Sequence, residues 1–99
     1  MAFRVSFSEE AWADADEIYD WIAANADLET AEGYVSRIIA FCDTLADFPR
    51  RGTPRDDLAP GLRTTVFEAR VIVAYVVDDE VRVLRILSHG RDAKRAFAG

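Results

Sequence analysis

Residues 71–77 read Val-Ile-Val-Ala-Tyr-Val-Val, an unbroken apolar segment in a chain of 99 residues. β-Branched and aromatic residues favour extended backbone, and seven residues are typical of a buried strand rather than of a helix. Polar, turn-forming segments flank it at 68–70 and 78–80. Strand patterns also occur at 62–67 and 81–88, and connections this short predict an antiparallel, three-stranded meander.

The residues before position 49 predict one strand and two helices. Phe3, Val5 and Phe7 alternate with polar residues, as in a half-buried strand. A helix is expected over about residues 9–25 and a second one after Asp27, because each follows an N-capping residue and carries an apolar stripe. The short polar break between them predicts an antiparallel helix hairpin. We therefore expect a single α+β domain over residues 1–99, with an N-terminal strand, the antiparallel helix hairpin and the three-stranded antiparallel meander.

The strand at 71–77 is apolar on both of its faces. Its residues alternate between the two faces, with Val71, Val73, Tyr75 and Val77 on one and Ile72, Ala74 and Val76 on the other. One helix hairpin covers only one face of a four-stranded sheet. We therefore expect the face that carries Ile72 and Val76 to stay exposed unless a partner covers it.

Charge is unevenly distributed along the chain. The net charge is −6, to which residues 1–48 contribute −9 and residues 49–99 contribute +3. An acidic chain is poorly suited to bind nucleic acid as a whole, so we expect no direct DNA binding. The difference in charge between the two halves of the chain suggests two surfaces with different partners, although a solvated acidic helix face explains most of the acidic residues. The longest apolar run is too short to span a bilayer and no leader pattern precedes the first strand, which predicts a cytoplasmic protein with no membrane contact.

No motif in the sequence indicates a cofactor or a metal site. Phosphate-binding loops, dinucleotide-binding glycine patterns and paired-histidine spacings do not occur. Cys42, the single cysteine, falls on the apolar stripe of the second helix, so we interpret it as a buried thiol. At Gly33 we expect the first helix to pack closely. Four acids of the first helix fall on its broad polar side and are interpreted as solvated: Asp14, Asp16, Glu17 and Asp20.

Candidate binding residues occur in three places. Trp21 lies off the apolar stripe of its helix, so it contacts either the neighbouring helix or a partner. The connection at 49–61 is either functional or a plain link to the sheet, and it carries Arg50, Arg51 and Arg55. His89 is either a general acid/base or a histidine satisfied by a backbone group. The surrounding arginines either form a basic patch or are solvated: Arg63, Arg85, Arg91 and Arg95.

Three segments, in this order and spacing, resemble the ParE branch of the RelE/ParE toxins of type II toxin–antitoxin systems. They are Leu-Ala-Asp-Phe-Pro-Arg-Arg-Gly-Thr-Pro-Arg-Asp-Asp-Leu at 45–58, Pro-Gly-Leu-Arg at 60–63 and Val-Leu-Arg-Ile-Leu-Ser-His-Gly-Arg-Asp at 83–92. The likeness covers about residues 3–93. It implies a compact α+β toxin that a cognate ParD-like antitoxin holds inactive in a toxin–antitoxin hetero-oligomer.

The resemblance leaves two kinds of target. ParE-like members poison DNA gyrase by protein contact, whereas RelE-like members cleave mRNA on the ribosome with a cluster of lysines and arginines and a C-terminal tyrosine or histidine. The connection at 49–61 has arginines but no lysine and the tail has no tyrosine, which favours gyrase, without catalysis and without a cofactor. Two alternatives stay open: a non-toxic module that binds an antitoxin, and an mRNA endonuclease with His89, Arg63, Arg85 and Arg91 as its catalytic residues.

The gyrase interpretation assigns residues to two surfaces. The resemblance places the contact with the target at the C-terminal strand and tail, on Arg85, His89, Arg91 and Arg95. We expect the antitoxin to contact Trp21, the arginines of the connection (Arg50, Arg51 and Arg55) and the open sheet face at Ile72 and Val76.

Overall fold

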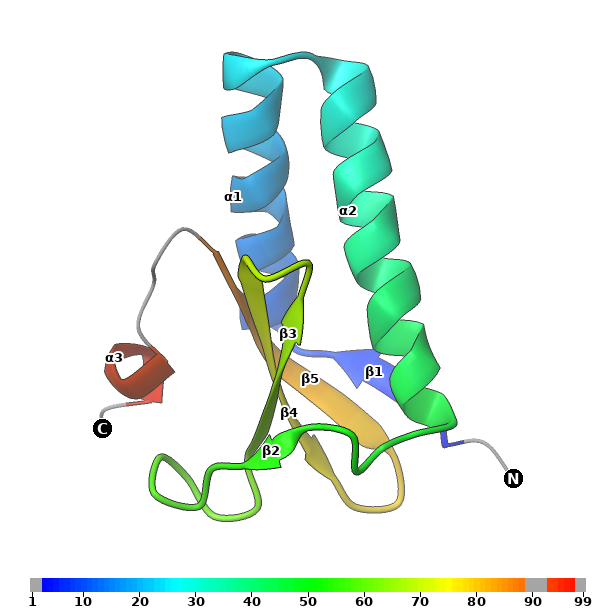
Figure 1. Cartoon of the computed structure of the whole chain (residues 1–99), viewed down its shortest axis with the longest axis vertical. Coiled ribbons are helices and arrows are strands. Elements are labelled where there is room, and N and C mark those ends of the chain that lie inside the picture. Colours follow the sequence, from blue (N-terminus) through cyan, green and yellow to red (C-terminus); the bar gives the residue numbers. More distant parts are fainter. Residues whose placement is uncertain (1–2, 89–92, 98–99) are drawn as a thin grey trace.

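The computed structural model describes residues 3–88 and 93–97. The elements in chain order are β1 (Val5–Phe7), α1 (Glu9–Asn25), α2 (Leu28–Asp43), the 3₁₀ turn η1 (Thr44–Ala46), β2 (Thr53–Pro54), β3 (Arg63–Phe67), β4 (Val71–Val77), β5 (Val81–Leu87) and α3 (Ala93–Phe97). Helices α1 and α2 run side by side as an antiparallel hairpin whose far end extends past the strands (Figure 1). The predicted α+β fold and its helix hairpin are therefore confirmed.

The five strands form one mixed sheet in the order β1-β5-β4-β3-β2. The meander β3-β4-β5 is antiparallel as predicted. β1 pairs in parallel with β5, with Val5 opposite Val81. The long segment between them, which contains the helix hairpin and strands β2 to β4, supplies the crossover that parallel pairing requires. The connection at 49–61 contains β2, which pairs with the start of β3.

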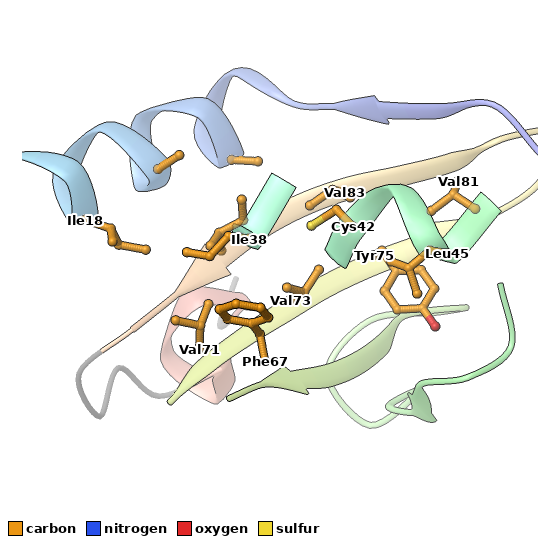
Figure 2. Packing of buried hydrophobic residues seen from close by; sticks show 13 residues of the cluster. Ile18, Ile38, Cys42, Leu45, Phe67, Val71, Val73, Tyr75, Val81 and Val83 are labelled. Atoms are coloured by element: carbon orange, nitrogen blue, oxygen red, sulfur yellow. The ribbon is translucent and has the colours of Figure 1, made fainter. Parts of the chain in front are cut away.

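The helix hairpin packs on one face of the sheet. Capping fixes where each helix begins, because the Ser8 hydroxyl accepts a hydrogen bond from the Ala11 N–H and the Asp27 carboxylate accepts one from the Thr30 N–H. Figure 2 shows the core between the two layers, built from Ile18, Ile38, Cys42, Leu45, Phe67, Val71, Val73, Tyr75, Val81 and Val83. Cys42 is buried there, as predicted, and burial raises the pKa of its thiol to about 12.

The second face of the sheet is less open than expected. Ala74 and Leu87 are buried on it, and Ile72 and Val76 are half-buried. Val66 is 55% exposed. In both views α3 and α2 lie on opposite sides of the sheet (Figures 1 and 2). The sequence patterns did not indicate this further helix, and the exposed apolar area of this face is smaller than expected.

The close approach expected at Gly33 is also wrong. A Cβ built at this position in α2 would meet no atom within 4 Å. None of the described helices combines the length and the apolar character needed to cross a membrane.

Candidate functional site

The N-terminal half of α1 completes the outer edge of β5. β1 pairs with β5 only as far as Val83, and α1 satisfies the backbone groups beyond it. The Ser8 N–H and hydroxyl donate to the carbonyls of Val83 and Leu84 at 2.9 and 2.7 Å, and the Ile86 N–H donates to the Asp14 carboxylate at 2.9 Å. Because polar side chains replace a neighbouring strand, the end of β5 is held against the helix hairpin.

Asp14 is buried, which corrects the interpretation of it as solvated. It is only 5% exposed, and the Arg85 guanidinium donates to both of its oxygens at 2.8 and 2.9 Å. The hydrogen bond to Asp14 raises the pKa of Arg85. Asp14 lies three residues after Ala11 and four before Ile18, at the border of the buried stripe, and the sequence pattern could not show that the edge of β5 covers this border. The other three acids are exposed as expected: Asp16, Glu17 and Asp20.

A buried tyrosine and Arg63 fix the connection between the hairpin and the sheet. The Tyr75 hydroxyl donates to the Pro49 carbonyl and accepts from the Gly52 N–H, each at 2.9 Å. Figure 2 shows this oxygen pointing out of the hydrocarbon core. Arg63 donates to the Gly52 carbonyl at 2.7 Å and to the Arg50 carbonyl at 3.2 Å. From the sequence, Tyr75 was placed on one face of its strand with no further role, although a hydroxyl in an apolar strand indicates a buried hydrogen bond.

The arginines of the connection differ in their surroundings. Arg50 and Arg51 are exposed, and with Phe48 and Pro49 they line an open hollow of about 460 Å³. The Arg51 guanidinium lies 5.5 Å from the centroids of the Phe41 and Phe48 rings, within cation–π range. Arg55 is half-buried and pairs with Asp57 at 3.0 Å. The two exposed arginines and the Phe48 ring therefore offer a contact surface to an acidic, partly apolar partner.

Trp21 lies beside a second hollow, at the far end of the hairpin. The tryptophan is 52% exposed, so it does not fill the core between the helices. The hollow has a volume of about 190 Å³ and draws its lining from both helices, from the start of β4 and from the end of β5: Trp21, Ile22, Thr30, Tyr34, Arg70, Val71 and Ser88. We call it the Trp21 groove.

Of the four proposed catalytic residues, the structure describes Arg63 and Arg85, and it does not bring these two together. Strand register places Arg63 on the face of Tyr75 and Arg85 on the face of Ala74, so the two arginines belong to opposite faces of the sheet. His89 and Arg91 lie outside the described residues, and Arg95 is exposed on α3. Within residues 3–88 and 93–97, no group of three or more His, Cys, Asp or Glu side chains could hold a metal ion.

Comparison with known proteins places this fold and these segments in one family. Residues 5–93 match the family described as the ParE toxin of the type II toxin–antitoxin system parDE. Two curated relatives come from Caulobacter vibrioides. Toxin ParE3 is 31% identical over 85% of this chain and 84% of its own length, and Toxin ParE1 is 28% identical over 88% and 90%.

Solved structures agree with the sequence relatives. The chromosomal ParDE toxin–antitoxin system from P. aeruginosa includes a chain that superposes with a TM-score of 0.77 at 27% identity, over 88% of this chain and 96% of that one. The toxin–antitoxin complex RelBE2 from Mycobacterium tuberculosis gives a TM-score of 0.65 at 20% identity, over 92% and 95% of the two chains, and at that identity the likeness extends to the fold alone. This chain therefore belongs to the ParE toxin family of type II toxin–antitoxin systems.

Proposed function

We propose that this toxin acts on DNA gyrase by protein–protein contact, without chemistry of its own, and that a cognate ParD-like antitoxin neutralises it. One observation carries the choice of gyrase over mRNA cleavage. The two described arginines of the alternative catalytic set, Arg63 and Arg85, lie on opposite faces of the sheet and are each engaged within the chain.

The positions of Arg63 and Arg85 disfavour a shared active site. General acid–base catalysis needs groups within hydrogen-bond reach of one substrate atom. Arg85 is bound by both oxygens of Asp14, and Arg63 is bound by two backbone carbonyls. An mRNA on either face would meet only one of them. The net charge of −6 further disfavours docking on ribosomal RNA.

The contact with the target is assigned to the C-terminal segment. Arg85 is anchored to Asp14 at the edge of β5, so its part in the contact is to hold the strand that leads into the segment. His89, Arg91 and Arg95 then supply the side chains that meet gyrase. Arg95 is exposed on α3 and available for this role.

The antitoxin proposal draws on the two solved systems, each of which is named as a toxin together with its antitoxin. Exposed apolar and basic surface on this chain supports such a partner, because Trp21, Arg50 and Arg51 are all exposed. The functional state at rest is then a toxin–antitoxin hetero-oligomer. Its location is the cytoplasm, where gyrase and DNA are found.

The test compares two sets of substitutions in one gyrase supercoiling assay. The triple variant His89→Ala, Arg91→Ala, Arg95→Ala is expected to lose at least about tenfold in inhibitory potency, because hot-spot arginines dominate protein contacts. The control variant Arg50→Ala, Arg51→Ala removes as many arginines from the other surface and is expected to keep its potency. Full potency in the triple variant would refute the assignment of the C-terminal segment.

A further inference from the structure

The Trp21 groove has the size and lining of a site for one large side chain. Its volume of about 190 Å³ slightly exceeds the roughly 150 Å³ of an apolar cavity that takes up benzene. Apolar and aromatic groups make up most of its lining, and Trp21 and Tyr34 supply flat ring surfaces on two different helices. Interfaces gain most of their affinity from single aromatic or aliphatic residues that fill such hollows.

One rim of the groove carries a positive charge that forms no ion pair with the described carboxylates. Arg70 is exposed there. The neighbouring carboxylate, Glu68, is bound by Arg37 across two hydrogen bonds of 3.1 Å. Within the part of the chain that the structure describes, Arg70 forms no ion pair. An occupant with a carboxylate beside its apolar side chain would therefore complement this rim.

The groove also ends beside the segment assigned to gyrase. Ser88, the last lining residue, directly follows β5 and directly precedes His89. A segment seated in the groove would occupy space next to the start of the C-terminal segment. A segment that binds in the groove would therefore also cover part of the surface assigned to gyrase.

We infer that the Trp21 groove is the anchor site for the antitoxin, which inserts one aromatic or large aliphatic side chain beside a carboxylate that meets Arg70. This inference rests on the proposed antitoxin partner. It adds the place and the chemistry of the contact, and it explains how one bound segment blocks the neighbouring target surface.

The test measures how fast labelled toxin leaves the purified toxin–antitoxin complex. Trp21→Ala removes one wall of the groove, and Thr30→Phe fills it without removing any buried group. Both are expected to speed dissociation at least about tenfold, since loss of an anchor contact shows mainly in the off-rate. Arg70→Glu is expected to speed dissociation and to weaken its dependence on salt.

Trp12→Ala is the matched control. Trp12 is on the same helix and is 47% exposed, but it packs against Phe7 in a tilted arrangement with 4.7 Å between ring centroids, and it does not line the groove. The dissociation rate of this variant is expected to stay within about twofold of the rate of the unmodified complex, as for a peripheral contact. A thermal melt of each variant confirms folding, and the filled variant decides the question if Trp21→Ala does not fold.

Two results would overturn the inference. One is dissociation of Trp21→Ala and Thr30→Phe at the rate of the Trp12→Ala control. The other is self-association of the toxin that Trp21→Ala abolishes while the antitoxin off-rate is unchanged, because a second copy would then be the occupant. The gyrase assay reports separately on the proposed function: failure to inhibit gyrase refutes the target, and the off-rates still decide the groove.

Discussion

At the scale of single residues, the buried carboxylate of Asp14 joins the first helix to the last strand. It accepts hydrogen bonds from the Arg85 side chain and from the Ile86 backbone. A charge this deeply buried is tolerable only because it is paired and fully hydrogen-bonded. No buried side-chain nitrogen or oxygen in the described residues lacks a hydrogen-bond partner.

Replacing this carboxylate tests its importance. Asp14→Asn keeps an acceptor for the Ile86 N–H but leaves Arg85 without its counter-charge, so we expect a loss of about 2–3 kcal/mol in the free energy of unfolding. Urea denaturation measures it. Asp16→Asn, an exposed neighbour on the same helix, should change stability by less than about 0.5 kcal/mol. Equal effects at the two positions would contradict the edge-capping role.

Two glycines predict opposite effects of one substitution. At Gly52, an added Cβ would lie 2.7 Å from the Tyr75 hydroxyl and 2.9 Å from the Thr64 carbonyl oxygen. We expect Gly52→Ala to cost about 1–3 kcal/mol, because a strand backbone cannot yield to the clash. Gly33→Ala adds a methyl group in open space on α2 and should stabilise by about 1 kcal/mol. Thermal unfolding of both variants measures the two changes in stability. A loss of stability in Gly33→Ala would contradict the open space that the structure shows at Gly33.

At the scale of elements, the turn between β3 and β4 is strained. Glu68 and Ala69 have φ values of 49° and 59°, left-handed backbone that favours glycine or asparagine, and the Arg70 N–H closes the turn on the Phe67 carbonyl at 3.1 Å. The ion pair of Glu68 with Arg37 ties this turn to α2.

Relief of that strain is measurable. We expect Ala69→Gly to raise the free energy of unfolding by about 1 kcal/mol, since glycine adopts positive φ without a steric penalty. Ala40→Gly, the same change at an exposed position inside α2, should lower it by about 1 kcal/mol. Chemical denaturation distinguishes them, and two losses of equal size would show that the turn is not strained.

Removal of the Tyr75 hydroxyl should loosen the connection at 49–61. Tyr75→Phe leaves the Gly52 N–H without its buried acceptor, at an expected cost of about 1–3 kcal/mol. Hydrogen exchange at the Gly52 amide should accelerate more than exchange in the strands. Tyr19→Phe on α1 is the control, and unchanged exchange at Gly52 in the Tyr75 variant would refute the anchoring role.

Local patterns predicted the elements well but not the contacts between their ends. Alternation and capping at Ser8 and Asp27 identified the strands and helices, because these signals lie within a few neighbouring residues. Contacts between residues more than 20 positions apart determine three features of the structure: the parallel pairing of β1, the burial of Asp14 and the hydrogen bonds of the Tyr75 hydroxyl. Periodicity carries no information at that range, so the candidate site was predicted by residue type rather than by arrangement.

At the scale of the whole molecule, charge and exposed apolar surface divide the toxin into two parts. Residues 1–48 carry a net charge of −9 and form the helix hairpin, whereas residues 49–99 carry +3 and form most of the sheet. The Trp21 groove lies where the two parts meet. A partner that spans this boundary would contact both signs of charge, as electrostatic complementarity requires of a specific interface.

We have proposed that the toxin binds gyrase and performs no chemistry. The most direct measurement places the purified toxin in a gyrase supercoiling assay with detection of cleavage complexes, and in parallel in a ribosome-dependent mRNA cleavage assay. If the toxin acts on gyrase alone, we expect inhibition of gyrase, relief of this inhibition by the antitoxin, and intact mRNA. Cleaved mRNA with unaffected gyrase would contradict this proposal and make His89 and the arginines catalytic candidates, whereas no effect in either assay would leave a non-toxic antitoxin-binding module.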